Sequence, residues 1–102
     1  MKQWIDAAAF DDIEEEDVAR FDHAGRTYAI YRVEGEVYAS DGLCTHEHAH
    51  LCDGFVMGHV IECPKHNGRF DVRDGRALCA PVCENLTTYP AKVEAGRILI
   101  EV

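Results

Sequence analysis

Residues 27–39 read Thr-Tyr-Ala-Ile-Tyr-Arg-Val-Glu-Gly-Glu-Val-Tyr-Ala, and this stretch decides the fold class. Thr27 to Val33 is a nearly continuous run of apolar and aromatic residues, which is typical of a strand buried on both faces. The Glu34-Gly35 pair signals a tight turn, and Val37-Tyr38-Ala39 follows it closely enough to form the second strand. We therefore expect a β-hairpin here.

The same pattern of turns and short β-rich runs continues on both sides of this hairpin. In Arg97 to Val102, strand periodicity puts Ile98, Ile100 and Val102 on one face and Leu99 and Glu101 on the other, and Tyr89 to Glu94 is expected to pair with this strand. No amphipathic stretch is long enough to predict a helix, so the fold class is all-β, with a small antiparallel β-sandwich or barrel. The turn signals are Ala24-Gly25, Glu34-Gly35, Asp41-Gly42, Asp53-Gly54, Asp74-Gly75 and Ala95-Gly96.

Length and composition describe one small domain with an acidic surface. A chain of 102 residues with 47% hydrophobic and 28% charged residues is ordinary for a globular protein, and cores rarely divide at this size. The net charge is −9, and residues 1–51 account for −8 of it with 12 acidic and 4 basic residues. Such a surface repels nucleic acid and anionic membranes, and it suits transient partners with basic patches.

The N-terminal residues carry no targeting signal. Met1 to Asp6 lacks the apolar core of a signal peptide, and no run reaches the roughly 18 apolar residues of a membrane helix. We therefore expect a cytoplasmic protein that is monomeric in isolation, with no membrane partner and no nucleic-acid partner.

Two short motifs in the middle of the chain have the composition of metal-ligand loops. Cys44-Thr45-His46 is followed, after 16 residues, by Cys63-Pro64-Lys65-His66. Each motif pairs one soft thiolate with one imidazole. If the two cysteines hold one iron and the two histidines hold the other, the site is a [2Fe-2S] cluster in which histidine replaces cysteine on one iron.

Two other interpretations of these four residues remain open. A tetrahedral zinc site accepts the same ligands, although zinc fingers usually group cysteine with cysteine and histidine with histidine. The four residues could also be a chance arrangement of buried cysteines and surface histidines. A zinc-stabilised structural module would be colourless, whereas an iron–sulfur protein is red-brown.

The chain resembles the Rieske-type ferredoxins of bacterial aromatic-ring-hydroxylating dioxygenase systems, the naphthalene-dioxygenase type in particular. Beyond the four ligands, the resemblance rests on Thr45, Pro64, the run Gly68-Arg69-Phe70-Asp71 and Ala80-Pro81-Val82, and it extends from about Trp4 to the C-terminus. It implies a Rieske fold with one [2Fe-2S] cluster. It also implies an electron carrier between a flavin-dependent NAD(P)H reductase and a terminal Rieske non-haem iron oxygenase that hydroxylates aromatic compounds.

Two related functions compete with this one. A Rieske oxygenase that itself activates oxygen needs a second domain with a 2-His-1-carboxylate iron site, and no residues remain for one, so we expect no enzyme activity. A small Rieske subunit of another redox complex, such as a nitrite reductase, is the alternative that stays open.

The positions of the motifs divide the single domain into two parts. We expect residues 1–40 and 86–102 to form a basal β-domain, and residues 41–85, with both ligand loops, to form an inserted cluster-binding subdomain. Rigid strands that present loops at one end are what a metal site needs.

The ligand set and its neighbours predict the redox behaviour. Two thiolates bring an oxidised core of charge +2 to zero, whereas four would bring it to −2, so histidine ligands raise the reduction potential. High-potential Rieske proteins add a disulfide, a serine and a tyrosine at the cluster. The corresponding places here include Ala49, Lys65, Gly68 and Phe70, which supply none of these groups, so we predict a potential at the low end of the Rieske range.

Several further residues attract attention without a clear role. Cys52, Cys79 and Cys83 are most simply small buried hydrophobes in a reducing compartment. His48 and His50 alternate with His46, either as a second metal motif or as surface imidazoles beside the cluster loop.

An acidic run precedes the central hairpin. Asp11 to Asp17 contains six acids in seven residues, and such a run is either a solvated loop or an electrostatic docking patch for a partner.

Overall fold

The computed structural model describes residues 2–45, 48–65, 67–79 and 84–102, with only the backbone of Cys79. Within these ranges the regular structure is strand, apart from two short 3-10 turns, so the all-β prediction is confirmed. No described helix is long and apolar enough to cross a membrane. In chain order the elements are β1 (Trp4–Ala9), η1 (Phe10–Asp12), β2 (Asp17–His23), β3 (Arg26–Val33), β4 (Glu36–Asp41), η2 (Leu51–Asp53), β5 (Phe55–Met57), β6 (Val60–Glu62), β7 (Arg69–Asp71), β8 (Ala77–Cys79), β9 (Thr88–Tyr89), β10 (Ala91–Glu94) and β11 (Arg97–Glu101).

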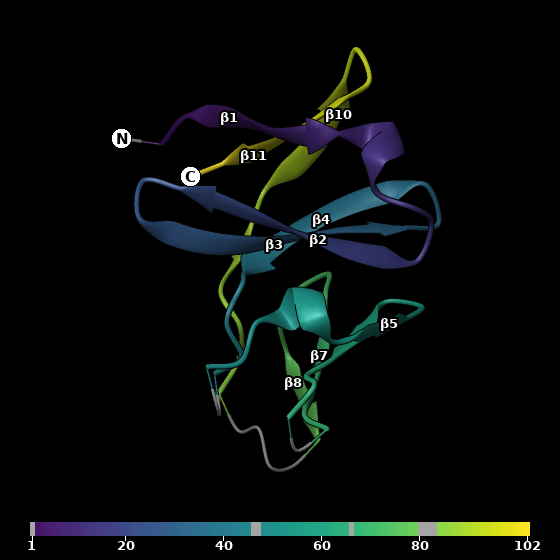
Figure 1. Cartoon of the computed structure of the whole chain (residues 1–102), viewed down its shortest axis with the longest axis vertical. Helices are drawn as coiled ribbons and strands as arrows, with labels where there is room; N and C mark the ends of the chain where they lie inside the picture. Colours follow the sequence, from purple (N-terminus) through teal and green to yellow (C-terminus); the bar gives the residue numbers. More distant parts are fainter. Residues whose placement is uncertain (1, 46–47, 66, 80–83) are drawn as a thin grey trace.

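The strands form three antiparallel sheets that follow one another along the long axis of the molecule (Figure 1). The first sheet has the order β1-β11-β10, the second β2-β3-β4-β9 and the third β5-β6-β7-β8. The second sheet lies between the other two, and the overall dimensions are 39 × 30 × 19 Å. The middle sheet must therefore present an apolar face in both directions.

Strand β3 meets this requirement, and its predicted burial on both faces is confirmed. Ala29 and Tyr31 point into an apolar cluster shared with the third sheet, whereas Tyr28 and Ile30 point into a second cluster shared with the first sheet. All four side chains are at most 4% exposed. Because successive strand residues face opposite sides, one apolar strand can fill two cores.

A buried hydroxyl pair adds a polar tie inside the middle sheet. The Tyr31 hydroxyl lies 2.8 Å from the Ser40 hydroxyl, and Ser40 donates onward to the carbonyl of Asp41 at 2.8 Å. Burial raises the pKa of Tyr31 well above its usual value, so the phenol stays neutral. Its hydrogen bond removes the free-energy cost of an unpaired buried hydroxyl.

Both predicted hairpin turns are present. Val33 pairs with Glu36 across Glu34 and Gly35, whose φ angles are 53° and 76°. Glu94 pairs with Arg97 across Ala95 and Gly96 in the same way, with φ angles of 50° and 76°. Two consecutive positive φ angles identify the tight turn whose twist matches antiparallel strands.

The predicted strand from Tyr89 to Glu94 is wrong in one respect, because Pro90 divides it. Tyr89 ends β9 and pairs with Ala39 of the middle sheet, whereas Ala91 begins β10 and pairs with Ile100 of the first sheet. Proline has no N–H to donate to a ladder, so the chain changes sheets at this residue.

Gly54 is predicted to be intolerant of any side chain. A Cβ atom there would lie 2.1 Å from the carbonyl oxygen of Glu62. Because this oxygen belongs to the main chain, it cannot turn away as a flexible side chain could. We expect Gly54→Ala to lower the free energy of unfolding by about 3 kcal/mol, as measured by urea denaturation.

Gly96→Ala is the matched control, because its Cβ atom would meet nothing within 4 Å. Only the cost of its positive φ remains, about 1 kcal/mol. If the two variants lose the same free energy of unfolding, the structure accommodates a Cβ atom at Gly54 without a penalty, and the prediction is wrong.

Candidate metal centre

Cys44 and Cys63 lie at the entrances of two loops that start from different sheets. Cys44 follows the end of β4, and Cys63 directly follows β6 of the third sheet. Their side chains are 1% and 0% exposed. Both belong to one apolar cluster with Leu51, Ile61 and Phe70, so the fold brings two cysteines that are 19 positions apart into the same core.

The two loops are closed by the same main-chain hydrogen bond. The N–H of Cys44 donates to the carbonyl of Ala49 at 2.8 Å, and the N–H of Cys63 donates to the carbonyl of Gly68 at 2.7 Å. In each loop the residue before the closing one, His48 or Asn67, has a positive φ angle, 55° and 56° respectively. Two loops of equal length and closure therefore present the two cysteines in matched backbone settings.

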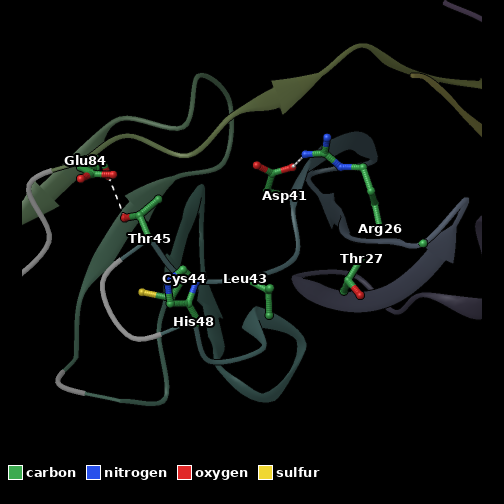
Figure 2. Close-up of a pocket in the computed structure, with 9 residues that line it drawn as sticks. Arg26, Thr27, Asp41, Leu43, Cys44, Thr45, His48 and Glu84 are labelled. Carbon is green, nitrogen blue, oxygen red and sulfur yellow. Dashed lines mark hydrogen bonds and ion pairs between the residues drawn. The ribbon is translucent and has the colours of Figure 1, made fainter.

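The first loop is also fastened to the segment that follows β8. Thr45 donates its hydroxyl hydrogen to the carbonyl of Glu84 at 2.9 Å (Figure 2). A pocket of about 420 Å³ opens beside this bond, with Cys44, Thr45 and His48 on its wall. Arg26 and Asp41, which form an ion pair at 3.4 Å, line the same pocket. Cys44 is therefore buried between the wall of this pocket and the apolar cluster.

The described part of the site fits an iron–sulfur group. Thiolates are the ligands of such clusters, and here two cysteine side chains enter one apolar cluster from two loops. His46 and His66, the two predicted histidine ligands, lie outside the described residues. Within the described ranges, no three or more residues of His, Cys, Asp or Glu come together as a metal site. The four-residue ligand set therefore stays a prediction.

Of the three remaining cysteines, the structure describes the side chain of Cys52 alone. Cys52 lies on η2, and its sulfur is 3.9 Å from a carboxylate oxygen of Asp53. Partial burial, with Asp53 beside it, raises the pKa of the Cys52 thiol, which keeps it protonated and unreactive. The side chain of Cys79 and all of Cys83 lie outside the described residues, as does Ala80-Pro81-Val82.

His48 and His50 have different settings. His48 is exposed and lines the pocket beside Cys44 (Figure 2). His50 forms an isolated β-bridge with Leu43, and its Nδ1 atom is buried without a hydrogen-bond partner in the structure. His48 is thus a surface imidazole, as one of the two interpretations expects, whereas His50 is half-buried.

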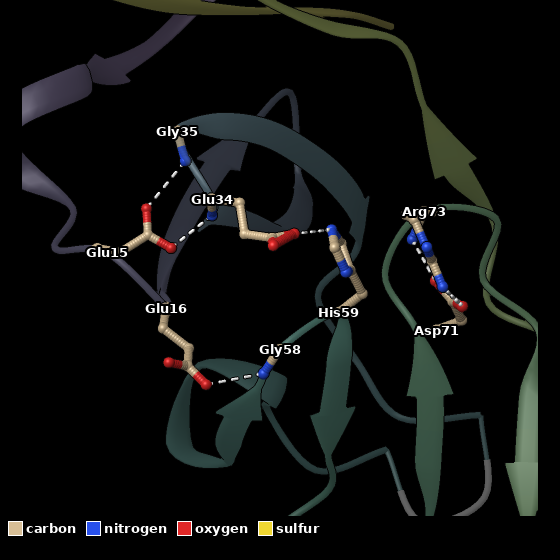
Figure 3. Close-up of polar contacts among 8 residues, drawn as sticks. All are labelled: Glu15, Glu16, Glu34, Gly35, Gly58, His59, Asp71 and Arg73. Atoms are coloured by element: carbon tan, nitrogen blue, oxygen red, sulfur yellow. Dashed lines mark hydrogen bonds and ion pairs between the residues drawn. The ribbon is translucent and has the colours of Figure 1, made fainter.

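The acidic run has a role that the sequence did not reveal. Glu15 and Glu16 accept hydrogen bonds from main-chain N–H groups in the β3–β4 and β5–β6 turns (Figure 3). His59, which showed no signal in the sequence, lies 3.3 Å from a carboxylate oxygen of Glu34. None of these contacts can be read from local sequence, because each joins residues at least 19 positions apart.

A buried carboxylate, that of Asp71, lies at the end of β7. Asp71 is 7% exposed and forms a two-pronged ion pair with Arg73, with N···O distances of 3.0 and 2.8 Å (Figure 3). The hydrogen bonds from Arg73 hold the pKa of Asp71 below its usual value. This pair braces the turn between β7 and β8 in the sheet that carries Cys63.

Comparisons with known proteins agree with this geometry. Residues 3–90 match the Rieske [2Fe-2S] domain family. The ferredoxin component of the naphthalene 1,2-dioxygenase system of Pseudomonas aeruginosa is 54% identical over 100 residues, which cover 98% of this chain and 96% of that protein.

Two solved structures extend the similarity to the fold. The Sphingomonas yanoikuyae B1 ferredoxin has a TM-score of 0.92 at 33% identity, covering 98% of this chain and 99% of the other. A chain in the complex of reduced oxygenase and oxidized ferredoxin in carbazole 1,9a-dioxygenase has a TM-score of 0.91 at 33% identity, covering 95% and 91%. The predicted Rieske fold and its cofactor, one [2Fe-2S] cluster, are thereby confirmed. This chain belongs to the Rieske [2Fe-2S] domain family.

Proposed function

We propose that this protein is the ferredoxin component of an aromatic-ring-hydroxylating dioxygenase system. It accepts single electrons from a flavin-dependent NAD(P)H reductase, passes them to a terminal Rieske non-haem iron oxygenase, and has no catalytic site of its own. The observation that carries this proposal is the 54% identity to a naphthalene dioxygenase ferredoxin over 98% of the chain. The same observation favours a dioxygenase partner over a nitrite reductase complex.

The chain's own residues divide the work of holding the cluster. Cys44 and Cys63 hold one iron, and His46 and His66 hold the other. When bound, the cluster supplies a site that gains and releases one electron. The burial of both cysteines in one apolar cluster supports this assignment, because it keeps water from the sulfur ligands.

The division of the chain into two parts is part of the proposal. Residues 41–85 form the cluster-binding subdomain, and residues 1–40 and 86–102 form the basal domain. The third sheet supports this division, since all four of its strands come from residues 55–79. The other two sheets each combine strands from before and after that segment.

The acidic surface bears on where the protein works and with what. We propose that the protein works in the cytoplasm, and we expect it to be a monomer in isolation, because copies of a chain with net charge −9 repel each other. The same charge favours a reductase or oxygenase with a basic docking face.

The first prediction concerns the cofactor. Iron and acid-labile sulfide should each be found at about two per chain, with a Rieske-type EPR spectrum after reduction. Cys63→Ser should lower the bound iron to about a tenth or less, because a ligand is lost. Cys52→Ser should retain the full content. Stoichiometric zinc without sulfide, in protein from iron-replete cells, would reject the assignment.

The second prediction concerns the reduction potential. We expect a value of about −150 mV, at the low end of the Rieske range, because Gly68 and Phe70 bring no hydroxyl to the cluster loops. We also expect the value to change little around pH 7. Protein-film voltammetry measures both, and a strongly positive or steeply pH-dependent value would contradict the prediction.

The third prediction concerns docking by the acidic run. Asp11, Asp12 and Glu14 are exposed, and the first two belong to η1, which directly follows β1 of the first sheet. We expect these three acids to steer a basic partner toward the protein. The D11N/D12N/E14Q variant should be reduced by its reductase a few-fold to about tenfold more slowly at low salt, with a flatter salt dependence.

A control with the same change of charge separates steering from net charge. Asp53, Asp74 and Glu94 are exposed acids outside this run, and D53N/D74N/E94Q should keep a salt dependence close to that of the parent. If the two triple variants behave alike in stopped-flow reduction, the acidic run has no special part in docking.

A further inference from the structure

Two glutamates of the acidic run act as hydrogen-bond acceptors for turns of two different sheets (Figure 3). The carboxylate of Glu15 accepts the N–H groups of Glu34 and Gly35, the latter at 2.9 Å, in the β3–β4 turn of the middle sheet. The carboxylate of Glu16 accepts the N–H of Gly58 at 2.8 Å in the β5–β6 turn of the third sheet. Neighbouring residues thus tie one segment to both sheets.

The backbone of Glu16 is set for this reach. Its φ angle is 62°, which non-glycine residues seldom adopt. Its N–H donates to the carbonyl of Arg32 at 2.7 Å, so the residue is anchored to β3 while its side chain extends to Gly58. A left-handed backbone at a non-glycine residue costs about 1 kcal/mol or more. Glu16 has this backbone conformation, and its side chain contacts a segment 42 positions away.

The contacted turn leads directly to a proposed iron ligand. Gly58 and His59 connect β5 to β6, and β6 ends at Glu62, immediately before Cys63. A displacement of this turn would therefore be passed along a three-residue strand to the entrance of the second ligand loop.

A second contact joins the same two turns. Nε2 of His59 lies 3.3 Å from a carboxylate oxygen of Glu34, and the His59 ring meets the edge of the Tyr38 ring with centroids 5.8 Å apart. The carbonyl of His59 accepts the N–H of Val72 at 2.8 Å, which continues the connection to the end of β7. The β5–β6 turn is thus held from the middle sheet and from within its own sheet.

We propose that Glu16 is a positioning residue for the metal centre, and that Glu15 supports it by fixing the opposing turn. Glu16 holds the strand that delivers Cys63, and its oxygen acceptor is what this role requires, not its negative charge. The inference rests on Cys63 being an iron ligand. It separates Glu16, which is itself exposed, from Asp11, Asp12 and Glu14, the acids of the same run that we expect to steer docking.

Alanine and glutamine at position 16 distinguish an acceptor from a charge. Both substitutions remove the charge, but the amide oxygen of glutamine still accepts the N–H of Gly58. We expect Glu16→Ala to lose its visible iron–sulfur absorbance about fivefold faster in excess chelator than the parent, with a broader EPR signal after reduction. Glu16→Gln should stay within about twofold of the parent.

Glu14→Ala is the matched control, since it removes an exposed acid of the same run and should leave the rate of cluster loss unchanged. Equal rates for parent and Glu16→Ala would overturn the proposal. Equally fast loss from Glu16→Gln and Glu16→Ala would overturn it too, because the charge would then be the active feature.

A readout without metal separates this inference from the proposed function. Hydrogen–deuterium exchange over residues 55–62 should be faster in Glu16→Ala than in Glu16→Gln, whether or not the chain holds a cluster. If exchange is faster in Glu16→Ala but the parent protein holds no iron, the iron assignment is rejected and the role of the Glu16–Gly58 hydrogen bond stands. If the parent holds its full iron content but exchange is the same in both variants, the role of that hydrogen bond alone is rejected.

Discussion

Strand β3 is buried on both faces, and the other layers of the molecule are arranged around it. Its odd-numbered residues, such as Ala29 and Tyr31, pack toward the third sheet, whereas Tyr28 and Ile30 pack toward the first. Each large side chain buried in this way contributes about 1.5–3 kcal/mol relative to exposure. Since both cores share one strand, neither outer sheet can shift without disturbing the packing of the other.

The metal centre uses the core on one side of that strand. Cys44 and Cys63 are buried in the cluster that also contains Tyr31 and Phe70, so the two proposed sulfur ligands belong to the same packing that holds the sheets together. The Tyr31–Ser40 hydroxyl pair satisfies the polar atoms of this core within the middle sheet. Both cysteine side chains are therefore part of the packed core between the middle and the third sheet.

Local pattern was enough to predict much of the fold. The hairpin after β3 and the hairpin before β11 follow from turn residues and alternation, and both are confirmed. The change of sheet at Pro90 was missed, although the missing N–H of proline was a usable signal. The roles of Glu15, Glu16 and His59 could not be predicted, because their partners are groups brought close only by the fold.

The candidate site was predicted from the sequence only in part. Spacing identified Cys44 and Cys63, and the structure places both in one core. Their histidine partners lie outside the described residues, so the assignment of His46 and His66 still rests on motif and family. The matched closure of the loops had no sequence signal, because main-chain groups make it.

That closure has a consequence for how such proteins diversify. In both loops the bond runs from the N–H of a cysteine to a carbonyl five positions later, at Ala49 or Gly68. Main-chain atoms are the same in every residue except for the absent N–H of proline, so mutation of the intervening side chains leaves the closing bond available. The closing bonds therefore place no demand on those side chains, and the demands on the loops come from Thr45, which bonds to Glu84, and from the proposed ligands His46 and His66.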